Sequence, residues 1–472
     1  MRWLFPLLLL AACSNPAPGG TTPPPACGDL DLGQPPARPS ALEPTAATYL
    51  GLGASDAANA VEIAPDCAVV VGGRMGGTEF GQSPTPLLGG TSGAVMRLDP
   101  KGQRVLSLTR LGAVVNDLEV RRQGGQIAVA GDFGLALLSP DGKTPLWSVT
   151  DQGAADRVAV GDDGTVAALF GKTLRVYDAG GKALGSRSFE DSAVNDVAVG
   201  SSARLVFVTG FAQRDGGACS QLQVAWVRAY DYTGQTLRWR AYDWSHAQAA
   251  GRNSSCADTR GMRLAMGRDG KLYFAGESAG GNTIYRYDPQ DLSKEAPNVK
   301  RGPYHDAYNT GANHITYYAR LEPADGKPLL GQILLARLPD TKKGNTLRPR
   351  AIAADEVGRV YVGGVAACCI ADRQGGGLQL NGQPLPDYAG EDAWVLVTSP
   401  DFQRDLLWMV WNKGGKGEVR GLAAASGTAA LAGRAKGPFH THQALQEVGH
   451  SGANADNSNG YASVWPGWRP AP

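Results

Sequence analysis

Short hydrophobic segments recur along the chain in groups of four, at a basic spacing of about 40 residues. Each group starts with an apolar strand, turns at Asp or Gly, and continues in a valine-rich strand that ends in Gly. A loop of variable length, a third strand, an Asp, Pro or Gly turn and a fourth strand follow. The clearest copy starts at Asp56 and contains DAANAVEIAPDCAVVVGG and SGAVMRLDPKGQRVLSLTRLG. Such a pattern predicts an all-β protein.

Seven copies fit this pattern. The later six contain VNDLEVRRQGGQIAVAGD, DRVAVGDDGTVAALF, VNDVAVGSSARLVFVTG, RGMRLAMGRDGKLYFAG, PRAIAADEVGRVYVGG and VRGLAAASGTAALAGR. Four short strands per repeat are typical of a β-propeller blade, which must pack against its neighbours to bury both faces. We therefore predict a seven-bladed β-propeller with long loops on one face, over residues 45–472. The last copy lacks a strand, and 48–51 (TYLG) are expected to supply it and to close the ring. In the fifth copy the third strand is either 282–289 or 314–326.

The first residues resemble a bacterial lipoprotein signal. A basic residue and a short apolar run precede Leu10-Ala11-Ala12-Cys13, so we expect residues 1–12 to be removed and Cys13 to be acylated. A plain secretory signal with an incidental cysteine is the alternative. Residues 13–44, rich in Pro, Gly and Thr, are expected to form a flexible tether. The prediction is a protein of the cell envelope, held outside the cytoplasm by a lipid anchor.

The cysteines agree with export. Six follow Cys13: Cys27, Cys67, Cys219, Cys256, Cys368 and Cys369. An even number in an oxidising compartment suggests disulfides. We favour the pair Cys219–Cys256, and Cys27–Cys67 would join the tether to the body. The adjacent Cys368 and Cys369 are either a vicinal bridge or free thiols.

Composition narrows the function classes. The chain has 45 basic and 44 acidic residues among 472, so it lacks the basic surplus of a general nucleic-acid binder. Gly and Pro, 64 and 30 residues, are abundant, as in turn-rich β proteins. A hydrophobic content of 43% suffices for a packed core.

Parts of the chain resemble the SBBP β-propeller repeat of secreted bacterial proteins. The similarity rests on TYLGLGASDAANAVEIAPDCAVVVGG at 48–73, VMRLDPKGQ at 95–103 and PRAIAADEVGRVYVGG at 349–364. The chain departs from that pattern at Cys67, where the family usually turns with Gly-Asn. The resemblance implies the fold and an exported location, and it implies no activity.

Histidine is scarce and lies in or beside the long loops expected at 74–92, 243–257, 288–313, 365–391 and 433–461. The six are His246, His305, His314, His440, His442 and His450. In His440-Thr441-His442 an extended backbone would turn both rings to the same side. We therefore predict a copper or zinc site at His440, His442 and His450, with His305 or His314 as a fourth ligand. The alternative is that these are solvated or hydrogen-bonded loop histidines.

The segment GPFHTHQALQEVGHSG at 437–452 is also similar to the copper-binding stretch of the copper/zinc superoxide dismutase family. That family is a Greek-key barrel with further ligands, including a C-terminal histidine that this chain lacks. Two hypotheses follow. The first is a binding or scaffold subunit of a cell-envelope assembly, such as a surface layer. The second is a copper-dependent, superoxide dismutase-like oxidoreductase that uses the 440–450 loop.

Overall fold

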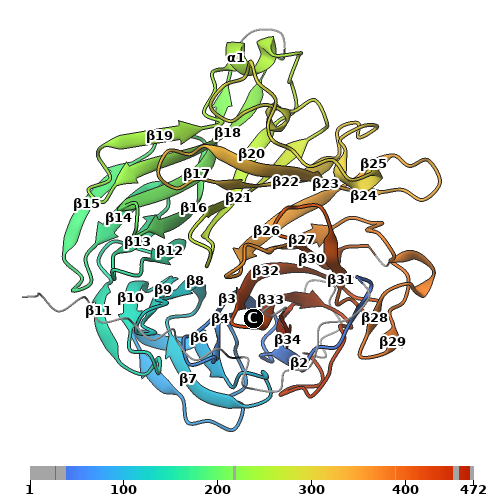
Figure 1. The fold of residues 1–472 in the computed structure, drawn as a ribbon. Coiled ribbons are helices and arrows are strands. Elements are labelled where there is room, and N and C mark those ends of the chain that lie inside the picture. Colours follow the sequence, from blue (N-terminus) through green and yellow to red (C-terminus); the bar gives the residue numbers. More distant parts are fainter. Residues whose placement is uncertain are drawn as a thin grey trace, which may run out of the picture.

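The structure is a computed structural model, and it describes residues 27, 39–215, 219, 221–388, 390–449 and 457–467. Its regular elements are nearly all β-strands, so the expected all-β class is confirmed (Figure 1). The described residues also contain the helix α1 (His246–Gly251) and the 3-10 turns η2 (Ile284–Arg286), η3 (Pro303–His305) and η4 (Gln374–Gly376). None of the described helices is long and apolar enough to cross a membrane.

Seven sheets of at least four strands follow one another along the chain. The first contains β3 (Ala57–Ile63), β4 (Val69–Arg74), β6 (Gly89–Leu98) and β7 (Val105–Leu111), with β5 (Thr85–Leu87) parallel to β7. The second contains β8 (Val115–Val120), β9 (Ile127–Gly131), β10 (Gly134–Leu138) and β11 (Pro145–Val149). The third contains β12 (Arg157–Val160), β13 (Val166–Phe170), β14 (Thr173–Tyr177) and β15 (Ala183–Ser188). The fourth contains β16 (Ala193–Gly200), β17 (Leu205–Arg214), β18 (Leu222–Asp231) and β19 (Leu237–Ala241).

The last three sheets carry the longest insertions. The fifth contains β20 (Thr259–Met266), β21 (Leu272–Ala279), β22 (His314–Leu321) and β23 (Pro328–Leu334). The sixth contains β26 (Leu347–Ala354), β27 (Val360–Ala366), β30 (Asp392–Thr398) and β31 (Asp405–Val410). The seventh contains β32 (Lys416–Ala425), β33 (Thr428–Lys436), β34 (Asn459–Pro466) and β2 (Ala46–Leu50). Between them lie the small strands β24 (Ala336–Arg337), β25 (Gly344–Asn345), β28 (Gln379–Leu380) and β29 (Gln383–Pro384).

Two details of the strand assignment are settled by the pairing. The third strand of the fifth sheet is β22, the second of the two alternatives, whereas residues 284–286 form the turn η2. The expected pairing of 48–51 with the last group of strands is confirmed, since β2 pairs antiparallel with β34 and places Thr48 opposite Ala462 and Leu50 opposite Gly460. Residues from the two ends of the chain therefore share the seventh sheet.

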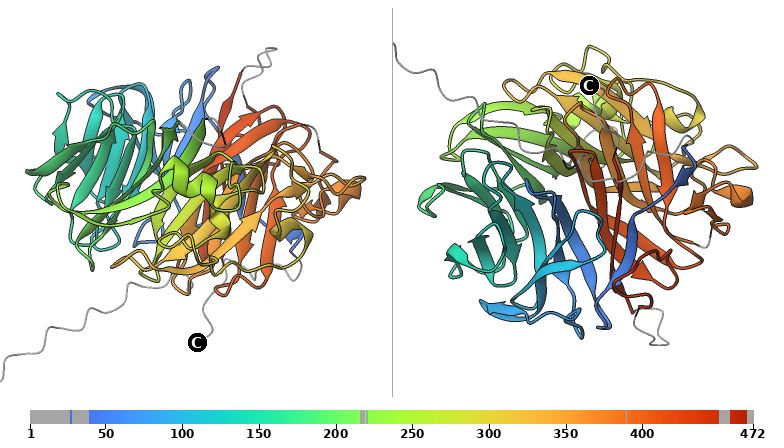
Figure 2. Two further views of the ribbon diagram at one scale, coloured as in Figure 1. Left: turned by 90° about the horizontal axis from the view of Figure 1, so that it is seen from above. Right: turned by 60° about the horizontal axis from the view of Figure 1, so that its bottom comes forward.

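The sheets are arranged around a common centre (Figures 1 and 2). The first strand of each sheet contacts the first strand of the next: β3 contacts β8, and the series continues through β12, β16, β20, β26 and β32. The series then returns to its start, because β32 also contacts β3. The side chains between neighbouring sheets form the hydrophobic core, with Trp226, Trp394, Trp411 and Trp465 among its largest fully buried members.

Chain direction places the long connections at one end of these first strands. In an antiparallel sheet the second strand ends where the first begins, so the loops that leave second strands lie at the same edge as the loops that enter the next sheet. The insertions after β21, β27 and β33 all leave second strands. We call this the long-loop face.

The chain before β2 is attached to the body. The short β1 (Ala41–Leu42) pairs parallel with β28, the side chain of Leu42 is buried, and the carbonyl of Pro39 accepts a hydrogen bond from Trp408 N (3.0 Å). These contacts begin before residue 45, where composition places the start of the body. The signal at 1–12 and the acylation site Cys13 lie outside the described residues.

All six later cysteines are paired as disulfides. Cys27 is bonded to Cys67, with a Cα–Cα distance of 5.3 Å, and Cys219 to Cys256, with 5.4 Å. Both separations lie in the usual range for disulfides. Cys368 and Cys369 form a vicinal pair, the first of the two alternatives. The first bridge joins the segment before the sheets to the turn between β3 and β4.

Candidate functional site

The predicted metal ligand His440 is engaged in structure. Its ring is buried after β33, and Nε2 lies 2.8 Å from Oδ1 of Asn381, to which the neutral ring donates. Burial, with smaller contributions from His442 and Lys413, lowers the pKa of His440 to about 4. His440 is thus a neutral side chain that holds the seventh-sheet loop against the turn between β28 and β29.

His442 lies beside β2. Its backbone forms a two-way bridge with Ala47, through Ala47 N to His442 O (2.8 Å) and His442 N to Ala47 O (3.0 Å). This bridge fixes the loop along the outer edge of β2. His450, the third predicted ligand, lies outside the described residues.

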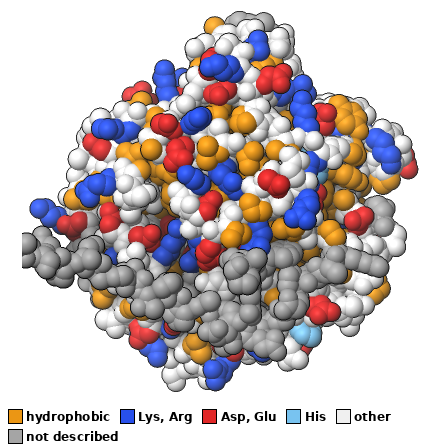
Figure 3. All heavy atoms as spheres, in the orientation of Figure 1, with side chains coloured by type: hydrophobic (Ala, Val, Ile, Leu, Met, Phe, Trp, Pro, Cys, Tyr) orange, Lys and Arg blue, Asp and Glu red, His pale blue; other side chains and the backbone are white. Residues whose placement is uncertain are grey.

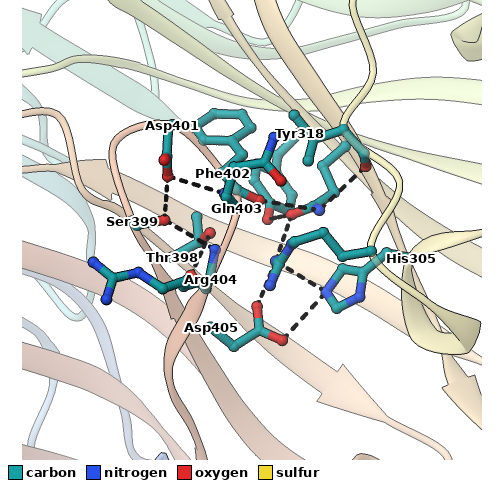
Figure 4. A network of polar contacts seen from close by, with 12 residues as sticks. His305, Tyr318, Thr398, Ser399, Asp401, Phe402, Gln403, Arg404 and Asp405 are labelled. Carbon is teal, nitrogen blue, oxygen red and sulfur yellow. Dashed lines mark hydrogen bonds and ion pairs between the residues drawn. The ribbon is translucent and has the colours of Figure 1, made fainter.

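His305 and His314 have partners of their own. His305 Nε2 lies 3.3 Å from Oδ2 of Asp405 and 3.1 Å from Nη2 of Arg301. Nη2 of Arg301 donates a hydrogen bond to Oδ1 of Asp405 (2.6 Å; Figure 4). Burial would raise the pKa of Asp405, but the hydrogen bond from His305 and the charge of Arg301 outweigh it and lower that pKa. His314 Nδ1 lies 3.4 Å from Oε1 of Glu277.

These contacts do not bring the predicted metal ligands together. Among the described residues, no three His, Cys, Asp or Glu side chains are placed to hold a metal ion. His305 and His314 do not join His440: the first ties the fifth-sheet insertion to β31, and the second packs on β21. His246, at the start of α1, is buried as well. For His450 the copper or zinc prediction stays a prediction.

A different site lies where the first strands begin. Six of the seven first strands carry a β-bulge, a single extra residue in the ladder to the second strand. The extra residues are Asn59, Asn116, Asn195, Met262, Arg350 and Arg420. All six line one open cavity, which we call the mouth, on the long-loop face.

In the six bulged sheets a glycine of the second strand stands opposite the residue that precedes the bulge. A Cβ on Gly73, Gly210 or Gly364 would meet a backbone carbonyl of the adjacent first strand, so no larger residue fits. The third sheet is the exception that tests this: β12 has no bulge, and Leu169 stands opposite Arg157. The repeated Val-rich strand ending in Gly is therefore the sequence signal for the mouth.

Polar contacts join every sheet to the next at the mouth. In order, they are Asn59 Nδ2 to Val115 O (2.8 Å), Asn116 Nδ2 to Ala155 O (2.9 Å), Arg157 Nε to Asn195 O (3.3 Å), Asn195 Nδ2 to Gly261 O (2.7 Å), Arg263 Nε to Arg350 O (2.6 Å), the Arg350–Glu418 ion pair (3.9 Å) and Arg420 Nη1 to Asn59 Oδ1 (2.7 Å). We call this series the belt. It passes through all seven sheets and returns to the first.

The cavity narrows below the belt. Asp117 and Asp196 accept hydrogen bonds from the backbone of the following sheet, at Val158 N (3.1 Å) and Leu264 N (2.9 Å). The mouth has a volume of about 570 Å³ and the channel beneath it about 120 Å³. The site is thus a polar funnel on the axis of the sheets.

Two arginines cross the channel at its far end. Arg122 of the second sheet donates to Gly267 O (3.0 Å) and Met266 O of the fifth, and Arg268 of the fifth donates to Ile63 O of the first (2.9 Å). Two carboxyls lie among them. Enclosure raises the pKa of Glu62 to about 7, and enclosure with the charge of Glu62 raises the pKa of Glu119 to about 8.

Surface charge outside the funnel is mixed. On the face drawn in Figure 3, Lys and Arg side chains are interspersed with Asp and Glu. A second cavity, of about 230 Å³, lies beside the fifth-sheet insertion and is lined by Arg252, Arg286 and Lys300, with His305 in its wall. Because Arg301 and His305 already hold Asp405, we regard the funnel as the main candidate site.

Comparisons with known proteins name no family. No protein-family model matches the chain, and no curated protein matches it. Among solved structures it is similar to the hydrazine synthase of Kuenenia stuttgartiensis, with a TM-score of 0.45 and 11% sequence identity over 79% of this chain and 92% of that one. A similarity at this level carries no statement about activity.

Proposed function

We propose that the protein is an exported, lipid-anchored binding subunit of a cell-envelope assembly, built on a closed seven-bladed β-propeller. Each of the seven sheets is one blade, and the mouth of the funnel is the recognition site. Ring closure is supported by the return of β32 to β3, by the closing strand β2 and by the belt. Closure packs the first strand of the last sheet against that of the first sheet, so that neither end of the series is left without a neighbour.

An extracytoplasmic location is supported by the chemistry of the cysteines. Structural disulfides persist in oxidising compartments, and Cys27–Cys67 and Cys219–Cys256 join residues far apart in sequence. The lipobox-like Leu10–Cys13 segment adds the anchor. The long-loop face is then the surface offered to a partner.

One observation supports the binding role: in six of the blades the bulged residue lines the same cavity. A bulge redirects a side chain and interrupts the ladder, and such features recur beside functional sites. Here the redirected side chains converge on a polar cavity of about 570 Å³, a size that suits a small molecule or the tip of a partner loop.

The test compares the two faces of the propeller in cells. A photo-crosslinking amino acid is placed at Leu52, an exposed residue in the long-loop connection between β2 and β3, or at Val357, an exposed residue in the tight turn between β26 and β27. We expect a discrete envelope adduct from Leu52 and none from Val357. Equal labelling from both positions, or no adduct from either, would contradict the proposal.

A further inference from the structure

Four arginines line the mouth: Arg420 is already bonded to Asn59 and Glu418, and the other three come from three further blades. Arg157 enters from β12, Arg263 from β20 and Arg350 from β26, and all three line the same cavity. Enclosure, then the charge of Arg157, lowers the pKa of Arg263 to about 9, and Arg350 adds to the effect. Like charges that line one cavity favour the binding of an anion between them.

Nearby carboxylates satisfy this charge only in part. Arg157 Nη1 lies 4.0 Å from Oδ1 of Asp117, and Arg350 Nε lies 3.9 Å from Oε2 of Glu418. Glu418 is already held by Arg420 at 2.7 Å and by a further arginine at 3.2 Å. The long contacts leave the guanidinium ends of Arg157 and Arg350 available to a ligand.

An inventory of hydrogen-bond donors leads to the same place. Arg263 donates from Nε to Arg350 O (2.6 Å) and from Nη1 to Met262 O (2.8 Å). Arg157 donates from Nε to a backbone carbonyl, and Arg350 donates from Nη1 to Pro349 O (3.4 Å). Within the described part of the chain, Nη2 of each of the three has no hydrogen-bond partner. A carboxylate accepts several such donors at once.

The mouth also offers acceptors. Asn116 and Asn195 each donate from Nδ2 to a backbone carbonyl of the next blade. Oδ1 of each side chain is therefore available to accept a hydrogen bond from a ligand. The carboxylate of Asp156 lies on the same wall. A ligand with hydroxyl groups beside its anionic group would use both kinds of site.

We propose that the mouth binds a small hydroxylated monocarboxylate of acidic-sugar size, with its carboxylate on Nη2 of Arg157, Arg263 and Arg350 and its hydroxyls on Oδ1 of Asn116 and Asn195. The inference rests on the proposed function only in taking the mouth as the recognition site. A single negative charge suits the site because Asp117, Asp196 and Glu418 stand nearby and would repel a dianion.

Calorimetric titration of the full-length protein, purified from membranes, tests the proposal. The probes are D-glucuronate, D-glucose, which lacks the carboxylate, and inorganic phosphate. The variant is Arg350→Gln, and its control is Arg348→Gln, which removes the same charge from the same strand outside the funnel. A thermal melt of both variants establishes that they are folded.

We expect D-glucuronate to bind, glucose not to bind, and phosphate to bind more weakly. Arg350→Gln should weaken glucuronate binding about 10-fold or more, as expected for a lost charged hydrogen bond, and Arg348→Gln should leave it within twofold. No glucuronate binding, equal binding of glucose, tighter binding of phosphate, or an unchanged affinity in folded Arg350→Gln would overturn the inference. Leu52 adducts formed in cells despite such a result would leave the proposed function standing.

Discussion

Replacing Glu119 by Gln should change how the stability of the protein depends on pH. Glu119 lies in the channel, accepts a hydrogen bond from Val160 N (3.0 Å) and has a pKa of about 8 against 4.5 when unfolded. A carboxyl with a raised pKa is protonated in the folded state and ionised in the unfolded state between these values. Its contribution to stability is therefore complete below about pH 4.5 and is lost as the pH rises toward 8.

The magnitude follows from proton linkage. One such group lowers the free energy of unfolding by about 1.4 kcal/mol for each pH unit between its two pKa values. Because Glu119 is only partly buried, we expect about half of this slope. Between pH 5 and pH 8 the wild type should thus lose roughly 2 kcal/mol more than Glu119→Gln, whose amide oxygen still accepts the hydrogen bond from Val160.

Differential scanning calorimetry from pH 5 to pH 8 measures this difference. For a chain of this size 1 kcal/mol corresponds to roughly 1 °C in melting temperature, so the two curves should separate by about 2 °C over the range. Glu190→Gln, at an exposed position of the same residue type, should run parallel to the wild type. If Glu119→Gln also runs parallel to the wild type, the carboxyl is ionised in the folded protein and the account of the channel is wrong.

Other predictions concern the anchor, the bulges, the first disulfide and the metal hypothesis. Cys13→Ser should move the protein from the membrane to the soluble fraction of the envelope, and unchanged fractionation would contradict the lipoprotein signal. Gly364→Ala should lower stability by about 1–3 kcal/mol, because its Cβ meets a carbonyl of β26, whereas Gly251→Ala, with open space around it, should be neutral in the same urea titration. Cys67→Ser, which opens a loop with a sequence separation of 40, should cost about 3–4 kcal/mol and lower the melting temperature under oxidising conditions only. If copper binds as the histidine pattern suggests, metal analysis should find one ion per chain that is lost in His442→Ala; copper well below one ion per chain would refute that hypothesis.

Local rules explain how much of the fold could be predicted. Alternating apolar residues and Asp-Gly turns act within a few residues, so the seven groups of strands were predictable. The strand at 48–51 was predictable because the seventh group lacked a strand that only a distant segment could supply. In the fifth sheet, His314–Leu321 and 282–289 had similar patterns, and only the ladder to β21 decides between them.

The candidate site was harder to predict because its residues act across sheets. Asn116 and Asn195 occur in the same local sequence, Val-Asn-Asp, yet their role depends on which strand packs next to them. The clustering of histidines drew attention to 440–450 instead. His440 is a buried hydrogen-bonding residue, and side-chain spacing along a loop cannot reveal the distant Asn381 that holds it.

The pairing of β2 with β34 has a consequence for the timing of synthesis. Thr45 donates to Val464 O across a sequence separation of 419 residues, so the seventh sheet cannot be completed until almost the whole body has left the ribosome. At 5–20 residues per second this delay is roughly 20–80 s. During that interval the seventh sheet stays incomplete, and for a chain exported as we propose this delay would keep it accessible to export machinery that accepts unfolded polypeptide. The pairing of β2 with β34 therefore sets the earliest time at which the last sheet can be completed.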